Sequence, residues 1–419
     1  MAQTKVKDQA RLSANIKQGV SAKGVSVPRL PDKSVSAPKR NTLTVKLPLK
    51  KGVSLLKKNI VTVIAFFAAA VTSVIVPPDA QYLTYFDVKT LTCLFCVLAV
   101  VCALKNIRFF YILAQRIVRL CKNARLSVLA MVYITFIGSM LIANDMALLT
   151  FLPLGYFVLH TTGKEKYMAF CFIMQNIAAN LGGMLTPFGN PQNLYLYSHF
   201  EIPTGEFMRI MALPFALSIL LITVLCLVFV KAEPLQIENS SDTLPKGRTA
   251  LYLCLFALSI AIVFRGIPYW IGLAVIPAVL LFADRDALKK VDYPLLLTFV
   301  FFFVFAGNMA RIDLVRNVFS ALLEKSTLLF SVLSCQVISN VPSAILLSQF
   351  TENYPQLLVG VNIGGAGTLI ASLASLITFR EYTKHNPGKT KKYIGLFSAF
   401  NFGFLAVLTS VMTVYFKLF

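Results

Sequence analysis

Long apolar runs separated by short polar connections make up most of the chain. Full-length runs occupy residues 59–77, 86–104, 207–231, 249–264, 268–284, 292–308 and 393–417. Each approaches the ~20 residues that a helix needs to cross a bilayer. The pattern therefore predicts an all-α, multi-pass membrane protein with the lipid bilayer as its surroundings.

Two further apolar regions are too short to be pairs of ordinary spans. Arms at 126–142 and 146–160 meet at Asn144 and Asp145, and arms at 327–338 and 343–350 meet at residues 339–342. Each pair is either two short spans joined by an external turn or a re-entrant hairpin that stops inside the membrane. We favour a hairpin because Arg125 lies at one end of the first pair and Lys164 at the other, and basic ends are typical of the cytoplasmic side.

One stretch, Asn180–Leu194, places glycine, proline and asparagine inside an apolar segment, and it recurs as Asn362–Leu376 in the second half. A surface loop would explain either stretch alone. A helix interrupted at bilayer depth survives only where protein, water or solute pairs its free backbone groups. Two such segments at corresponding positions are the pattern expected of a secondary transporter's binding site.

The same order of elements therefore occurs twice, in residues 86–231 and 292–419: span, surface helix, hairpin, broken helix, span. The surface helices are predicted at 105–125 and 311–325, where charged and apolar residues interleave. The pattern predicts nine crossings and two hairpins, with a cytoplasmic N-terminus, an external C-terminus and two inverted repeats. The predicted divisions are a tail (1–57), membrane domains (58–231 and 249–419) and a cytoplasmic linker (232–248).

Composition supports a membrane protein and argues against a nucleic-acid partner. Of the 419 residues, 57% are hydrophobic and 14% charged, and the mean hydropathy is +0.72. The formal net charge is +22, but 14 of the 40 Lys and Arg residues precede residue 59. We interpret that basic segment as a disordered cytoplasmic tail that sets the topology. We expect no cleaved signal, because no apolar run appears before Asn59.

The two broken segments carry motifs that resemble the ion transporter superfamily, which includes divalent-anion:sodium symporters, citrate transporters, arsenite-efflux pumps and some sodium/proton antiporters. The motifs are GG-x-x-T-x-x-G-x-P-x-N from Gly182 and NIGGAGTLIAS from Asn362, and the resemblance covers about 59–419. In the symporters, a Ser-Asn-Thr triplet at each hairpin tip binds the substrate carboxylate. The resemblance puts these triplets at Ala143-Asn144-Asp145 and Ser339-Asn340-Val341, where only the asparagine is kept in both.

The resemblance implies a substrate site and a coupling-ion site at the tips and helix breaks. The residues implied for substrate are Asn144, Thr186, Asn190, Ser339, Asn340, Thr368 and Ser372. The residues implied for a coupling ion are Asn144, Asp145, Gly189, Asn193, Asn340 and Ser375. Hydrogen bonding between helices is the structural alternative for Asn144 and Asn340.

These features predict a secondary transporter of a small anion, with a di- or tricarboxylate as first candidate, coupled to sodium or protons by alternating access. An arsenite-type efflux permease and a sodium/proton antiporter are the alternatives. Asp145 either exchanges a proton for a cation or caps the helix that follows it. Nothing indicates the rings of a channel pore, and His160, His199 and His385 are too scattered for an enzyme site. We expect no cofactor beyond sodium; a homodimer is compatible with this plan.

Overall fold

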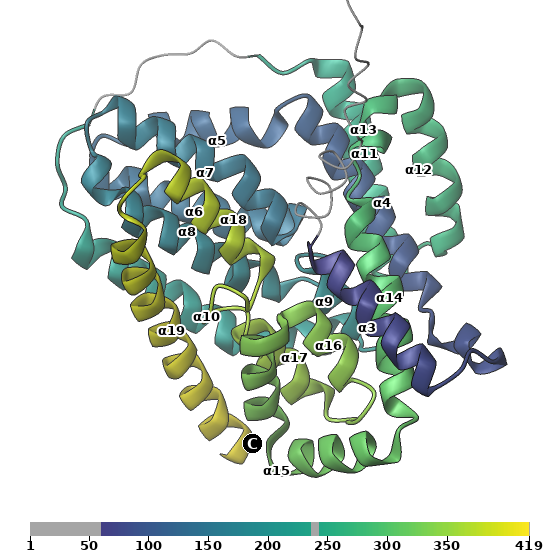
Figure 1. The fold of residues 1–419 in the computed structure, drawn as a ribbon. Helices are drawn as coiled ribbons and strands as arrows, with labels where there is room; N and C mark the ends of the chain where they lie inside the picture. The colour runs from purple at the N-terminus through teal and green to yellow at the C-terminus, as the bar shows by residue number, and fades with distance from the viewer. Residues whose placement is uncertain (1–59, 236–242, 419) are drawn as a thin grey trace, which may run out of the picture. The chain divides into compact units, whose positions relative to one another are not determined.

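The computed structural model describes residues 60–235 and 243–418, and this part of the chain is almost entirely helical (Figure 1). The predicted tail (1–57) lies outside the described residues, as do residues 236–242 of the predicted linker. Within the described ranges no strand forms, and one isolated bridge joins Asn123 to Pro234. The prediction of an all-α fold is confirmed.

The long apolar runs form helices whose ends lie within a few residues of the predicted ones. These helices are α3 (Ile60–Ile75), α4 (Val88–Asn106), α10 (Thr204–Phe229), α11 (Lys246–Val263), α12 (Tyr269–Ala283), α14 (Tyr293–Ala310) and α19 (Thr390–Leu418), with the short α13 (Arg285–Lys289) after α12. Aspartates set two of the starts. The Asp87 side chain accepts the Thr90 N–H at α4, and the Asp292 side chain accepts the Leu295 N–H at α14.

The first predicted surface helix is shorter than the basic stretch suggested. Residues 105–125 contain only one separate helix, α5 (Phe109–Arg119), because α4 continues through Lys105 to Asn106. Arg108 adopts a left-handed conformation (φ 56°) at the junction and turns the chain between the two helices. Charge spacing alone did not reveal this turn.

Both short-armed regions form helical pairs that reverse at a single residue. The first pair is α6 (Ala124–Ile142) and α7 (Asn144–Thr161), which reverses at Ala143. The second is the end of α15 (Asp313–Ile338) with α16 (Asn340–Leu347), which reverses at Ser339. Non-helical dihedrals at Ser326 divide α15 into the predicted surface helix and the first arm. The second arm begins at Asn340, three residues before its predicted start.

Both repeated stretches interrupt helices. In the first half α8 (Met168–Gly182) is followed by the 3₁₀ turn η3 (Gly183–Leu185), a non-helical stretch and α9 (Pro191–His199). In the second half α17 (Tyr354–Ile363) is separated from α18 (Leu373–His385) by a similar stretch. The first interruption coincides with the glycine and proline residues of its stretch, and the second with the glycines of its stretch.

Eight of the described helical segments are long and apolar enough to cross a membrane. They include α6 and α15, which belong to the hairpin regions, while α3 and α12 are apolar but shorter. The membrane character is therefore clear, whereas the predicted nine crossings and the inversion of the repeats remain predictions.

The described helices form two neighbouring groups (Figure 1). In the first group α11, α12 and α13 pack around α4, and α3 packs along α14. The second group holds both hairpins and both broken helices, with α6 against α8, α15 against α17, and α18 against α7 and α8. Contacts of α4 with α9 and of α14 with α16 join the groups.

Candidate functional site

The two hairpin tips have the same local geometry. Ala143 and Ser339 have positive φ angles, 63° and 76°, with ψ angles of 152° and 159°. The asparagine that follows each of them folds its side chain back, so that Asn144 Oδ1 accepts the Asp145 N–H and Asn340 Oδ1 accepts the Val341 N–H, both at 2.9 Å. Each asparagine therefore caps its own helix and turns its amide group toward the rest of the site.

A threonine from each broken helix holds the corresponding hairpin. Thr186 Oγ1 donates to the Met140 carbonyl at 3.0 Å, and Thr368 Oγ1 donates to the Gln336 carbonyl at 3.1 Å. Each acceptor lies three residues before its tip. The equivalence of these bonds agrees with the alignment of the two repeated stretches.

Glycine permits the close packing of hairpin on broken helix in both halves. A Cβ atom on Gly182 would lie 2.3 Å from the Phe136 carbonyl oxygen and 2.7 Å from Ser139 Oγ. A Cβ atom on Gly364 would lie 2.8 Å from the Cys335 side chain. Ser139 and Cys335 both lie four residues before their tips. A larger side chain at either glycine would separate the hairpin from the break.

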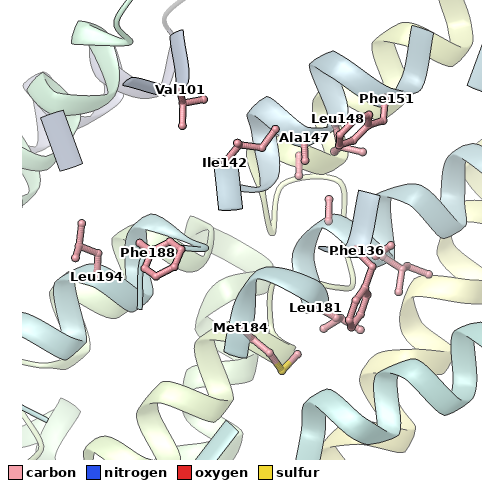
Figure 2. Packing of buried hydrophobic residues seen from close by; sticks show 14 of the residues in the cluster. Val101, Phe136, Ile142, Ala147, Leu148, Phe151, Leu181, Met184, Phe188 and Leu194 are labelled. Carbon is pink, nitrogen blue, oxygen red and sulfur yellow. The ribbon is translucent and has the colours of Figure 1, made fainter. Parts of the chain in front are cut away.

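Figure 2 shows the apolar packing around the first of these contacts. Ile142, Ala147 and Leu148 lie on either side of the first tip, and Leu181, Met184 and Phe188 belong to the neighbouring broken helix. All six are at most 7% exposed. The first tip and the first break are therefore held in a dry environment, where hydrogen bonds and dipoles act more strongly than in water.

Buried amides connect the two halves behind the tips. Asn362 Nδ2 donates to Asn193 Oδ1 at 2.6 Å, and Asn190 Nδ2 and Gln192 Nε2 approach Asn362 Oδ1 at 3.3 and 3.4 Å. Helix α9 of the first half is thereby tied to α17 of the second. Asn193 Nδ2 also donates to the Gly183 carbonyl at 3.1 Å, which satisfies part of the broken backbone.

Asn180 brings the two tips toward a common point. Asn144 Nδ2 donates to Asn180 Oδ1 at 3.3 Å. A Cβ atom on Gly365 would lie 3.1 Å from Asn340 Nδ2 and 3.6 Å from Asn180 Oδ1, so Asn180 lies between the amides of the two tips, next to this glycine. Both tip asparagines are nearly buried, at 5% and 4% exposed.

A cavity of about 600 Å³, here called the tip cavity, lies against both hairpin tips. The helices that begin at its wall include α7 at Asn144, α9 at Pro191, α16 at Asn340 and α18 at Leu373. Helix N-termini carry free N–H groups and a partial positive charge, so several of them together favour an anion.

The predicted site residues fall into two sets. Asn144, Asp145, Ser339 and Asn340 line the tip cavity. The others hold the breaks behind it. Ser372 caps α18 by accepting the Ser375 N–H at 3.2 Å, and Gly189 N–H donates to the Thr186 carbonyl at 3.2 Å. The remaining members of this second set are Asn190, Asn193 and Thr368.

Three buried oxygen atoms near the site have no hydrogen-bond donor among the described residues: Asp145 Oδ1, Asn190 Oδ1 and Gln192 Oε1. Asp145 and Gln192 also line the tip cavity. Buried acceptors are normally paired, so these atoms suit a proton, a desolvated cation or a donor group of a solute.

Sequence reasoning did not name Asn180, Asn362 or Gln192 as site residues. The first two were visible as an aligned pair at the start of the repeated stretches, but their side-chain partners lie 36 and 169 to 172 residues away. Gln192 lies between the motif residues Pro191 and Asn193, and its contact with Asn362 depends on how the two broken helices cross.

Comparison with known proteins places this arrangement in a family. The family model described as Citrate transporter matches residues 52–358. An uncharacterized transporter of Methanocaldococcus jannaschii is 34% identical over 294 residues, covering 70% of this chain and 80% of that protein. The inner membrane protein YbiR of Escherichia coli is 29% identical over 279 residues, covering 65% of this chain and 74% of that protein. The chain is a membrane transporter, not an enzyme, and it belongs to the citrate transporter family.

Proposed function

We propose that this protein is a secondary active transporter that moves a small organic anion by alternating access, coupled to sodium or protons. The observation that carries the proposal is the meeting of two equivalent asparagine tips and several helix N-termini at one cavity. A transporter whose repeats each supply half of a site is expected to have this geometry. The family description makes a di- or tricarboxylate the first anion to test.

Neutral donors would bind the anion. Asn340 Nδ2 has no acceptor among the described residues. Ser339 adds a hydroxyl at the same tip, whose proton would turn from the Ala371 carbonyl to the anion. The N-terminus of α16 begins there and adds a favourable dipole. Donors of this kind bind an anion without forming an ion pair. An ion pair with a fixed positive side chain would slow the release of the anion.

The three unpaired oxygens support a coupling cation. A sodium ion prefers oxygen ligands, and a proton on Asp145 would likewise remove an unpaired buried acceptor. Because Asp145 and Asn340 line the same cavity, cation and anion would bind close enough to stabilise each other. This mutual stabilisation is the coupling that we propose.

In the proposed cycle, the conformation described here is the one in which the tip cavity opens to the cytoplasm. The tip cavity is lined by Ile60, Asp292 and Arg380, which the charge pattern predicts to be near the cytoplasmic face, and also by Met309 and Phe319, which it predicts to be near the external face; we propose that the cavity opens on the side of the charged residues. A second, polar cavity of about 510 Å³ lies at the other ends of α9 and α16, where it is lined by His199 and Gln349 among others. We propose that this second cavity is the external entrance.

Between the two cavities a hydrogen-bonded contact joins α9 to α16. Tyr195 Oη and Ser348 Oγ are 2.8 Å apart, and Gln349 Nε2 donates to Tyr195 Oη at 3.3 Å. In the proposed cycle this contact is closed when the tip cavity is open, and it separates when the site faces outward.

Uptake into proteoliposomes tests the function. Citrate, succinate and labelled monocarboxylates would be supplied under imposed sodium or proton gradients, with Asn340→Ala as the inactive control. We expect gradient-dependent accumulation of at least one anion in the wild type alone. Equal uptake by wild type, variant and empty liposomes would contradict the proposal.

Cysteine labelling tests the orientation separately. Single cysteines near Gly163 and His385 should react only from the cytoplasmic side, and one near Glu201 only from outside. Labelling of Gly163→Cys from outside would reverse the assignment of the first hairpin.

A sodium/proton antiporter is the second candidate, because Asp145 is an unpaired carboxylate at the tip cavity. It would exchange sodium for protons in liposomes that contain no organic anion. An arsenite-type efflux permease is tested in the same vesicles by adding arsenite.

A further inference from the structure

The walls of the tip cavity are less polar than the end of the cavity that lies against the hairpin tips. Helix α14 contributes Phe302, Phe305 and Met309, α15 contributes Phe330, and α3 contributes Ile64. Most of the other lining side chains are also apolar. The amides of Asn144, Gln192 and Asn340 lie at the tips and the first break, whereas the wall hydroxyls of Thr62 and Thr298 are paired with each other. A solute in this cavity would therefore meet polar groups at one end and hydrocarbon along its sides.

The charges around the cavity do not suit a multiply charged solute. Its lining includes three ionisable side chains among the described residues, namely Asp145 at the tip and the exposed Asp292 and Arg380. Their formal sum is −1 when all are ionised. One coupling cation would bring this sum to zero, so a tricarboxylate would add three uncompensated negative charges and a monovalent anion only one, and a desolvated charge without a partner is costly.

We infer that the solute is an organic anion with a single charge and an apolar body. Its charged group binds at the asparagine tips and helix N-termini, and its apolar part packs against Phe305 and Met309. The inference rests on the proposed anion transport. It favours monovalent anions with an apolar body over compact polycarboxylates.

The size of the cavity supports this assignment. Its volume of about 600 Å³ lies within the ~300–1,000 Å³ typical of pockets that enclose larger organic molecules, which are mostly lined by apolar and aromatic side chains with few placed polar groups. A bilayer lipid is the other occupant that such walls accept, and the experiment distinguishes it.

Two matched pairs of anions test the inference in proteoliposomes: benzoate against acetate, and p-toluenesulfonate against methanesulfonate. Each pair shares a charged group and differs in the apolar body, and the sulfonates stay ionised and do not leak as neutral acids. Citrate and succinate complete the panel. We expect the aromatic member of at least one pair to have a KM on the order of tenfold lower than its small partner.

The cavity wall is tested by Phe305→Ala, with Phe301→Ala as the matched control. Phe301 is on the same helix and contacts Phe66, but it does not line the cavity. Phe305→Ala should raise the KM of the aromatic anion several-fold, to roughly tenfold, and leave the small partner unchanged. Phe301→Ala should change neither value.

Three results would overturn the inference, and they separate it from the proposed function. If citrate or succinate accumulates in an Asn340-dependent manner while the aromatic anions do not, the anion transporter stands and the apolar substrate falls. If aromatic and small anions have equal KM values, or both phenylalanine variants act alike, the wall contacts lipid and not solute. If none of the anions accumulates, both proposals fall.

Discussion

The two hairpin tips share a backbone geometry, but they present different side chains to the cavity. In both, a residue with positive φ precedes an asparagine that caps its own helix. The first tip then carries Asp145, whose Oδ1 has no donor among the described residues. The second carries Val341 at this position, and its Ser339 donates to the Ala371 carbonyl at 3.2 Å.

The difference indicates that the two tips have different roles in transport. Equivalent backbone and asparagine groups are what both halves need in order to form one site. An ionisable group is needed only once, since a second carboxylate beside the first would repel it. We therefore expect substitutions at the shared asparagines to have similar effects, and substitutions at the unequal positions to differ.

The largest effect is expected at the shared asparagines. Replacing Asn144 or Asn340 by alanine removes the capping group and the amide donor together, and should reduce transport to background. Proteoliposome uptake measures the loss, and thermal unfolding shows whether the protein still folds.

Asn353→Ala is a suitable control, because Asn353 also caps a helix, α17, but lies away from the tip cavity. It should transport like the wild type. If the two tip variants retain transport, the binding site is elsewhere; if only one loses it, the tips are not equivalent.

The next effect concerns the unequal position. Asp145→Asn keeps the size of the side chain but cannot ionise, so gradient-driven accumulation should be lost while exchange of solute across the membrane continues. The pH dependence of transport should also flatten, because the titrating group is gone. Accumulation and exchange assays from pH 5.5 to 8.5 measure both changes.

Val341→Asn is the matched control, since it puts the same amide at the equivalent position of the other tip. It should accumulate solute with an unchanged pH profile. If Asp145→Asn accumulates normally, the Asp145 carboxylate takes no part in coupling. If both variants lose accumulation, an amide next to either tip asparagine is harmful in itself, and the loss does not identify the carboxylate.

A smaller effect is expected where the two halves are alike behind the tips. Thr186→Val and Thr368→Val remove the hydroxyls that hold the Met140 and Gln336 carbonyls. Each should lower the free energy of unfolding by about 1 kcal/mol, because a partly buried carbonyl loses its donor. Thermal unfolding in detergent measures the change.

Thr413→Val provides the baseline, because among the described residues the Thr413 hydroxyl bonds only to the Thr409 carbonyl within its own helix. It should be nearly neutral. A decrease for only one of the site threonines would show that the hairpins are held differently in the two halves.

The smallest effect is expected at the bases of the hairpins, which also differ. The base of the first is tied by Glu233, which binds Lys164 at 2.9 Å and Lys166 at 2.5 Å, while the second uses a neutral bond from the Leu328 N–H to Gln356 Oε1. Hydrogen bonds from Lys166, Lys164 and the Tyr167 hydroxyl lower the pKa of Glu233 to about 2.

A lowered carboxyl pKa stabilises the fold above the ordinary glutamate range, and this stabilisation disappears as the pH falls from about 4.5 toward 2. Glu233→Gln should therefore slightly lower the unfolding temperature at pH 7, by an amount that shrinks in acid. Glu324→Gln, at an exposed residue near the base of the second hairpin, should have no effect at either pH. An equal loss in both variants would mean that net charge, and not the ion pairs, is responsible.

The sequence alone determined the helical membrane fold, the two hairpins, the broken helices and the repeated order of elements. It could do so because each depends on local chemistry: apolar length sets a span, and Gly182 with Pro187 or Pro191 prevents a continuous helix. The asparagines at the tips were also visible, since a polar residue between two short apolar arms marks the point where the chain reverses.

Only the tertiary structure decided which of the predicted residues face the cavity. Asn144 and Asn340 come from different halves of the chain, and their approach to Asn180 and Gly365 follows from how two hairpins pack on two breaks. The same packing hides Thr186 and Ser375 behind the site and brings in Gln192. The apolar wall at Phe305 looked like an ordinary lipid-facing or core residue, because a helix pattern shows which residues are apolar but not which of them surround a cavity.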